Sequence, residues 1–142
     1  MHIHRFCIVV GALLVIALGS ACSFTTANIS GLKLSKDKEG TNETNSFAPG
    51  DPIYARATVS NVPSKVTLKF RLFTENVEGQ QQNAPVSQFD TSIEMPRSGI
   101  GTYSLTPPPR GWPVGKYRIE VAMLIESGEQ KDHKAVTFTV AR

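Results

Sequence analysis

Alternation of apolar and polar residues is the feature that most limits how this chain can fold. Apolar side chains recur at every second position in four separate runs, which are separated by glycine, proline, asparagine and serine clusters. The four runs cover residues 53–59, 66–72, 117–125 and 136–140. A period of two is typical of a β-strand with one buried face, because successive side chains point to opposite sides of the strand. The pattern therefore predicts an all-β protein.

Weaker runs lie between these four. Residues 29–34 alternate imperfectly, and residues 86–93 and 100–105 are further strand candidates, which brings the total to about seven strands. No stretch of ten residues has the spacing of an amphipathic helix, and nine prolines interrupt the chain. Seven short antiparallel strands in a chain of this length favour a sandwich of two sheets in a single domain.

The N-terminus has the pattern of an export signal. A basic start with Arg5 precedes an apolar run over residues 6–18, and small residues follow at positions 19–21. The run from residue 6 to 21 has 16 residues, which is short of the roughly 20 that a membrane-spanning helix needs. We therefore expect a cleaved signal peptide, with an uncleaved membrane helix as the alternative.

The end of this signal resembles the lipobox of bacterial lipoproteins, on the residues LGSAC at positions 18–22. The family prefers leucine three residues before the cysteine, where this chain has Gly19. The resemblance implies that the Cys22 thiol carries diacylglycerol and that acyl chains hold the protein on a membrane in the cell envelope. Ser23 is not the aspartate associated with inner-membrane retention, which favours the periplasmic face of the outer membrane in a diderm cell. A plain secretory signal cut near Ala21 is the alternative.

The expected organisation is a signal peptide over residues 1–21, a lipidated cysteine with a short tether over 22–27, and a β-sandwich domain over 28–142. Only five residues separate Cys22 from Asn28, and an extended chain of that length spans at most about 20 Å. The domain is therefore expected close to the bilayer. The other cysteine lies in the signal, so the domain folds without a disulfide.

A second resemblance concerns the fold. Residues 111–121, GWPVGKYRIEV, follow three prolines and resemble the corner between strands E and F of bacterial immunoglobulin-like domains, while residues 47–54, FAPGDPIY, are similar to the loop and strand B. The resemblance implies an immunoglobulin-like sandwich in which the Tyr117 hydroxyl bonds a backbone group a few residues upstream. The family's inter-sheet disulfide and buried strand C tryptophan have no counterpart, because Lys69, Phe70 and Arg71 occupy the middle of that strand.

Residues able to do chemistry are scattered. The mature chain has one histidine, His133, which we place in the hairpin between the last two strands; a catalytic triad or a zinc site needs more partners. Glu75 with Glu78 and Glu126 with Glu129 are expected in polar loops, which do not form the dry cleft that paired carboxylates require. We predict no catalytic residue, no cofactor and no metal. The alternative is a small periplasmic hydrolase, or an enzyme inhibitor, acting through acidic loops.

Partner binding is therefore the expected activity. Without Arg5 the 15 basic residues fall to 14 against 12 acidic ones, and this weak, scattered charge argues against nucleic acid as a partner. The possible partner-binding residues are Pro108, Arg110 and Trp112, since polyproline segments, arginine and tryptophan are enriched at recognition sites. The alternative is that Trp112 only caps one end of the sandwich. The expected partners are the membrane, through the lipid anchor, and a protein or envelope polymer.

Overall fold

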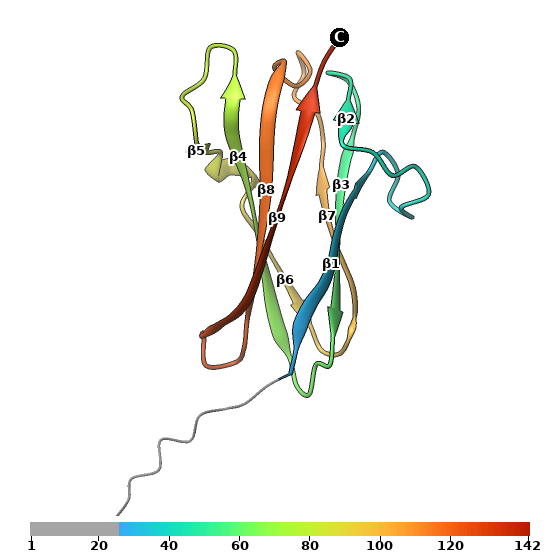
Figure 1. The fold of residues 1–142 in the computed structure, drawn as a ribbon, viewed down its shortest axis with the longest axis vertical. Coiled ribbons are helices and arrows are strands. Elements are labelled where there is room, and N and C mark those ends of the chain that lie inside the picture. Colours follow the sequence, from blue (N-terminus) through green and yellow to red (C-terminus); the bar gives the residue numbers. More distant parts are fainter. Residues whose placement is uncertain (1–25) are drawn as a thin grey trace, which may run out of the picture.

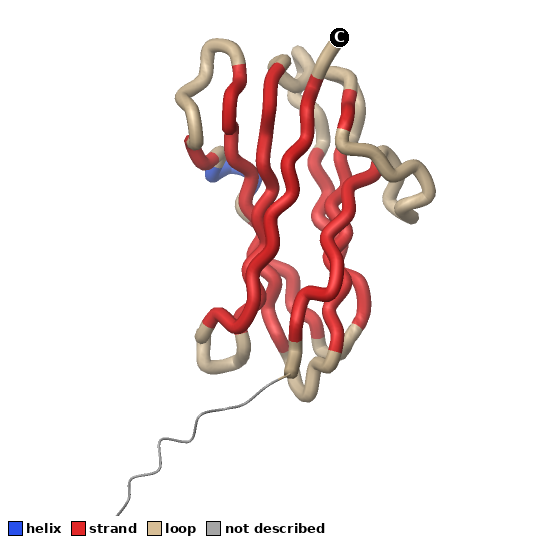
Figure 2. Tube along the Cα trace, in the orientation of Figure 1, coloured by secondary structure: helices blue, strands red, loops and turns tan. Residues whose placement is uncertain are grey.

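Two β-sheets packed face to face make up the computed structural model, which describes residues 26–142 (Figures 1 and 2). The prediction of an all-β sandwich is confirmed. Within residues 26–142 the helical content is one 3₁₀ turn, η1 (Ser87–Phe89), and the structure has no helix of the length and apolar character that crossing a membrane requires. The predicted signal peptide and Cys22 lie outside the described residues.

The smaller sheet contains three antiparallel strands in the order β1 (Asn28–Ser35), β3 (Ile53–Ser60) and β7 (Gly99–Leu105). The register between β1 and β3 shifts between Ile29 and Gly31. An irregularity of this kind moves later side chains to the other face. The shift therefore explains why residues 29–34 alternate imperfectly in the sequence.

The larger sheet has the order β2, β9, β8, β4, β5, and β6 also pairs with β4. Its strands are β2 (Ser46–Phe47), β4 (Val66–Val77), β5 (Ala84–Pro85), β6 (Thr91–Met95), β8 (Gly115–Leu124) and β9 (Gln130–Val140). The expectation of antiparallel strands throughout is wrong at one place, because β2 pairs with β9 in parallel. Residues 36–45 fold back on the end of β1, with an antiparallel bridge between Ser35 and Glu43, and then carry the chain to the other sheet. There β2 runs in the same direction as β9 (Figure 1).

The core lies between the sheets and is formed by the inward rows that the alternation predicts. At Gly101 a large side chain of the larger sheet faces a small residue of the smaller sheet, since a Cβ atom added there would lie 2.8 Å from Cδ1 of Leu68. The Phe70 ring stacks on the Tyr103 ring across the interface, with centroids 5.0 Å apart. Burying each large side chain contributes about 1.5–3 kcal/mol, so these rows supply much of the driving force for folding.

Two local predictions are wrong. Residues 86–93 do not form one strand, because η1 separates β5 from β6, and the turn carries the Phe89 ring to 5.5 Å from the Trp112 ring. His133 lies inside β9 and not in the hairpin turn. That turn is residues 125–129, where the backbone N–H of Ile125 donates to the carbonyl oxygen of Glu129 at 3.0 Å.

The strands run lengthwise, so the sandwich has two distinct ends (Figure 1). The described chain enters at the end formed by turns 61–65, 96–98 and 125–129, which we call the proximal end. The opposite, distal end holds the C-terminus and the connections 48–52, 78–83 and 106–114. The proline-rich corner singled out in the sequence therefore lies at the end away from residue 26.

Candidate functional site

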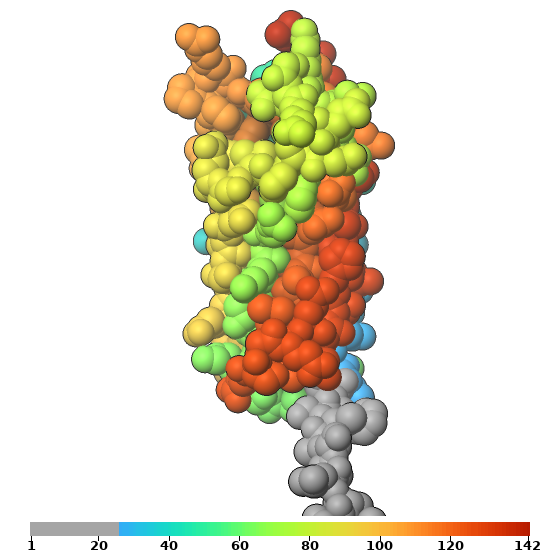
Figure 3. Space-filling model, turned by 90° about the vertical axis from the view of Figure 1, so that its left-hand side faces the viewer, coloured from blue at the N-terminus to red at the C-terminus, as the bar shows by residue number. Residues whose placement is uncertain are grey.

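A groove with a volume of about 280 Å³ opens near the distal end, and we call it the distal groove. Val86 and Phe89 line it from the connection between β4 and β6, whereas Pro108, Trp112 and Pro113 line it from the connection between β7 and β8. Figure 3 shows loops 78–83 and 106–114 standing apart at this end, with a hollow between them. The groove is largely apolar and aromatic, which is the usual lining of a binding site.

The structure brings together two of the three predicted partner-binding residues. Pro108 and Trp112 both line the distal groove, and Arg110 is exposed at the turn between them. The indole of Trp112 is buried, with 3% of the residue exposed. Trp112 therefore forms part of the wall and floor, and the groove residues that lie open to solvent are Pro113 and the amides Gln80 and Gln88.

Hydrogen bonds fix Trp112 from two directions. Its indole Nε1–H donates to the carbonyl oxygen of Asp51 at 2.9 Å, and its backbone N–H donates to the carbonyl oxygen of Pro49 at 2.7 Å. The backbone approaches Pro49 this closely because residue 111 is glycine: φ is +78° there, and a Cβ atom would lie 2.8 Å from the Pro49 oxygen. The connection 106–114 is thereby fastened to the connection 48–52.

Behind the groove, aromatic rings contact one another in an unbroken series, which we call the aromatic row. The centroid separations are 5.5 Å for Phe89 to Trp112, 6.5 Å for Trp112 to Tyr117, 5.1 Å for Tyr117 to Phe138 and 5.6 Å for Phe138 to Phe47. Aromatic pairs contribute about 0.5–1.5 kcal/mol each beyond the area they bury. The row therefore ties η1, the distal loops and the strands β8, β9 and β2 into one support.

Tyr117 connects this row to the backbone. Its hydroxyl donates to the carbonyl oxygen of Pro113 at 2.7 Å, four residues upstream, which is the contact that the corner motif implies. Burial raises the pKa of Tyr117 to about 12, so the phenol stays protonated and remains a donor at neutral pH. The Tyr103 hydroxyl similarly donates to the carbonyl oxygen of Phe89. Both walls of the groove are thus held by buried phenols.

The wall formed by the connection after β4 also depends on a residue that the sequence pattern did not single out. The Thr74 hydroxyl lies 2.8 Å from the carbonyl oxygen of Gln81 and 3.3 Å from that of Ala84, so it holds the connection after β4 against the sheet. Thr74 is buried and sits beside a shift in the register of β4 with β8. The sequence does contain one sign of it: Thr74 is a polar residue at the position where the next inward, apolar side chain of β4 would be expected.

The acidic loop residues do not converge on the groove. Glu75 lies near the distal end of β4 and its carboxylate accepts a hydrogen bond from Arg118 at 3.0 Å, while Glu78 begins the loop that follows β4. Glu126 and Glu129 lie in the turn at the proximal end. Among residues 26–142, no group of three or more histidine, cysteine, aspartate or glutamate residues is arranged to hold a metal ion.

Comparison with known proteins gives little further information. Neither a protein-family model nor a curated protein matches this chain. Among solved structures, the chain is similar to the PmoD soluble domain from Methylocystis sp. ATCC 49242 (Rockwell), with 14% sequence identity and a TM-score of 0.44. The match covers 78% of this chain and 89% of that one. A likeness at this level identifies neither a family nor a function.

Proposed function

We propose that this protein is a bacterial lipoprotein, acylated at Cys22, which holds an immunoglobulin-like sandwich at the surface of a membrane as a non-catalytic binding module. The observation that carries the proposal is the position of the distal groove, at the end of the sandwich opposite residue 26 (Figure 1). An anchor at Cys22 would place the proximal end against the bilayer. The groove would then face a partner in the envelope.

The connectivity supports an immunoglobulin-like assignment. Strands β1, β3 and β7 form one sheet and β4, β8 and β9 form the centre of the other, so the chain passes between sheets repeatedly, as in Greek-key sandwiches. The hydrogen bond from Tyr117 to Pro113 supplies the corner contact of such domains. The parallel pairing of β2 with β9 results from the chain changing sheets between β1 and β2.

The chemistry of the groove favours recognition over catalysis. Its lining combines aromatic rings, prolines and the amides Gln80 and Gln88. Such residues supply contact area and adaptable hydrogen bonds, which are the means of protein and polymer recognition. The acidic alternative requires carboxylates to converge, but Glu75 lies toward one end of the sandwich and Glu126 at the other. No observation favours a hydrolase.

Site-specific photo-crosslinking in intact cells tests the binding function. A benzophenone side chain replaces Gln88, which is exposed and lines the groove; the matched control replaces Thr137, which lies on the outer face of β9. We expect a discrete adduct from position 88 and none from position 137. Equal labelling from both positions, or none from either, would contradict a binding role for the groove.

The anchor is tested separately, so that its failure leaves the groove result interpretable. We expect the intact mass of the membrane-extracted protein to correspond to a chain that begins at Cys22 and carries acyl groups. In Cys22→Ser the chain should leave the detergent phase on phase separation. Recovery of a mature wild-type chain without acyl groups would remove the lipoprotein assignment.

A further inference from the structure

Arg56 lies on the outer face of the smaller sheet, in the central strand β3, and it has no counter-charge. Its Nε atom is buried and has no hydrogen-bond partner within residues 26–142, and no carboxylate in that range forms an ion pair with it. A guanidinium has five N–H donors and remains charged at any physiological pH. Leaving a buried polar atom unsatisfied is costly, so an arginine in this state calls for an explanation.

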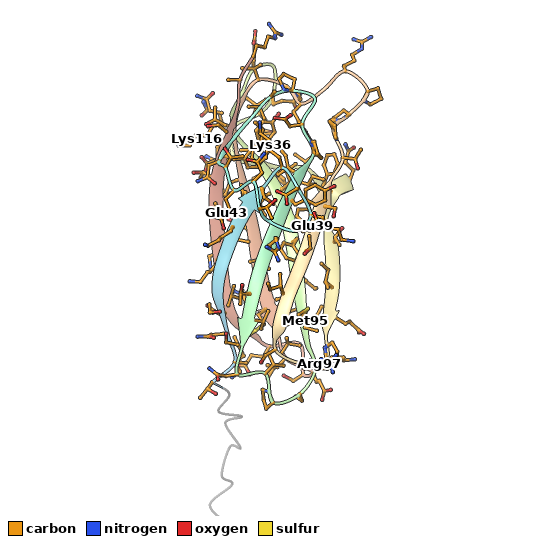
Figure 4. The ribbon with its side chains drawn as sticks, turned by 90° about the vertical axis from the view of Figure 1, so that its right-hand side faces the viewer. Lys36, Glu39, Glu43, Met95, Arg97 and Lys116 are labelled. Carbon is orange, nitrogen blue, oxygen red and sulfur yellow. The ribbon has the colours of Figure 1, made fainter. Side chains whose placement is uncertain are left out.

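The loop between β1 and β2 packs directly on this guanidinium. A Cβ atom built on Gly40 would overlap Nη1 of Arg56, and φ at Gly40 is +78°. Figure 4 shows the loop crossing the upper part of this sheet, with Glu43 on the β1 side and Glu39 on the β7 side. The glycine leaves the space that the arginine occupies, so the loop partly covers the guanidinium.

A small pocket of about 70 Å³ lies at this contact. Arg56, Lys33 and Thr58 line it, and the Thr58 hydroxyl offers a further donor. Glu43 lines it as well, with its carboxylate paired to Lys33 at 3.1 Å. Ile100 borders it with 49% of the residue exposed. The pocket thus combines one cation that is unpaired among the described residues, Arg56, and a hydroxyl with the Lys33–Glu43 ion pair and an adjoining apolar surface.

The charge arrangement is unfavourable as it stands. Lys33 and Arg56 occupy directly opposed positions on β1 and β3, and like charges in that position destabilise a sheet. The carboxylate of Glu43 lies 3.1 Å from the Lys33 ammonium, and both side chains are exposed. Glu43 therefore pairs with Lys33, and Arg56 remains without a counter-charge.

Arginine on the outer face of the larger sheet is treated differently. Arg118 donates to Glu75 at 3.0 Å and to Glu120 at 2.9 Å. Its guanidinium also lies over the Phe73 ring, 4.6 Å from the centroid. The same chain therefore pairs an outer-face arginine with two carboxylates where the arginine has a structural role, which makes Arg56 an exception.

We propose that this pocket binds a small oxyanion, a carboxylate or a phosphate, held by Arg56 with Thr58 beside the Lys33–Glu43 ion pair. The planar guanidinium can bond two oxygens of such a group at once. The volume of about 70 Å³ suits a single group of this size, and the exposed face of Ile100 would contact an apolar part of the molecule that carries it. This site goes beyond the proposed function, because it lies on a sheet face and not in the distal groove.

Titration of the full chain with two anions tests the site and separates the two sources of charge. The protein is ¹⁵N-labelled and kept in a non-ionic, phosphate-free detergent; inorganic phosphate and acetate are added in parallel, with chloride as the ionic-strength control. We expect saturable shifts of the Arg56 Nε–H and Gly40 N–H resonances. Saturation by phosphate alone assigns a phosphate site, and saturation by acetate alone or by both assigns a carboxylate-accepting site.

Variants decide whether Arg56 is responsible. Arg56→Gln should abolish the saturable shifts, and Arg56→Lys, which keeps the charge but loses the fork, should weaken binding by about tenfold or more. Arg97→Gln is the matched control, since Arg97 is an exposed arginine in the proximal turn 96–98. Should Arg56→Gln fail to fold, Gly40→Ala gives the second test, because its methyl group would displace the guanidinium. Shifts no larger than those with chloride, or shifts that survive these substitutions, would overturn the proposal.

Discussion

The two ends of the sandwich are built in different ways. At the distal end, the aromatic row packs against the connection 106–114 through Trp112, and side-chain hydrogen bonds from Trp112, Tyr117 and Thr74 reach backbone carbonyls in all three connections. At the proximal end, short turns close over aliphatic residues, and the Val62 N–H reaches only the exposed hydroxyl of Ser98. Turns need little support to close a sandwich. The additional ring contacts and hydrogen bonds at the distal end therefore hold the residues that line the groove in place.

The largest expected effect is loss of Trp112. Trp112→Ala removes a buried indole and its bond to Asp51, and we expect unfolding to become easier by about 3–5 kcal/mol. Val62→Ala, in the half-buried part of a proximal turn, should cost about 1 kcal/mol or less. Urea denaturation followed by circular dichroism measures both. Equal losses of unfolding free energy from the two substitutions would contradict this difference between the ends, because Trp112 would then contribute no more to stability than a half-buried turn residue.

Two glycines with similar backbone angles provide a closely matched pair. Gly111 has φ of +78° and packs against Pro49, whereas Gly128, in the proximal turn, has φ of +88° and has nothing within 4 Å of an added Cβ atom. We expect Gly128→Ala to cost about 1 kcal/mol, the penalty for an alanine at positive φ. Gly111→Ala should cost about 1–3 kcal/mol more, because of the clash. Equal losses of unfolding free energy for the two substitutions would mean that the connection 106–114 can move away from Pro49 at little cost.

Alkaline pH should weaken the distal end through Tyr117. Its pKa is raised to about 12 in the folded protein from 10.0, so the unfolded chain releases the proton first. Stability is therefore full below about pH 10 and is lost as the pH rises through about 12. Tyr117→Phe should cost about 1 kcal/mol at pH 7 and make the alkaline loss shallower. Some loss should remain, since burial also raises the pKa of Tyr103. Urea midpoints at pH 8 and pH 11 measure the difference.

The smallest expected effect is at the proximal end. Ser98→Ala removes the acceptor of the Val62 N–H, but the contact is exposed and water can replace the hydroxyl. We expect a change within about 0.5 kcal/mol by the same denaturation assay. A loss comparable with that of Tyr117→Phe would show that the proximal turns are as strongly fastened as the distal connections.

Alternation in the sequence is sufficient to predict the sandwich, because a period of two reports burial on one face wherever a strand is regular. The rows from Ile53, Val66 and Tyr117 are regular and lie in the core. The prediction fails at residues 86–93, where a long-range aromatic contact between Phe89 and Trp112 replaces strand pairing with a turn. The alternation of neighbouring residues does not indicate a contact between residues this far apart in the sequence.

The candidate sites show the same limit. Pro108 and Trp112 could be singled out by residue type, but the opposite wall of the groove comes from a separate segment that includes Val86 and Phe89. Arg56 reads in the sequence as a water-facing residue of a strand, like Lys69 and Arg71. Only the fold reveals that its Nε atom is buried without a partner while Arg71 lies beside Asp90 and over Phe73.

The direction of β1 has a mechanical consequence. Residue 26 enters the sandwich at the proximal start of β1, and β1 runs lengthwise beside β3 toward the distal end. Traction between residue 26 and a molecule seated in the groove would act parallel to these strands. The hydrogen bonds between β1 and β3 would then all carry the load at the same time and would not break one after another. Loading of this kind gives a small domain high resistance to mechanical unfolding.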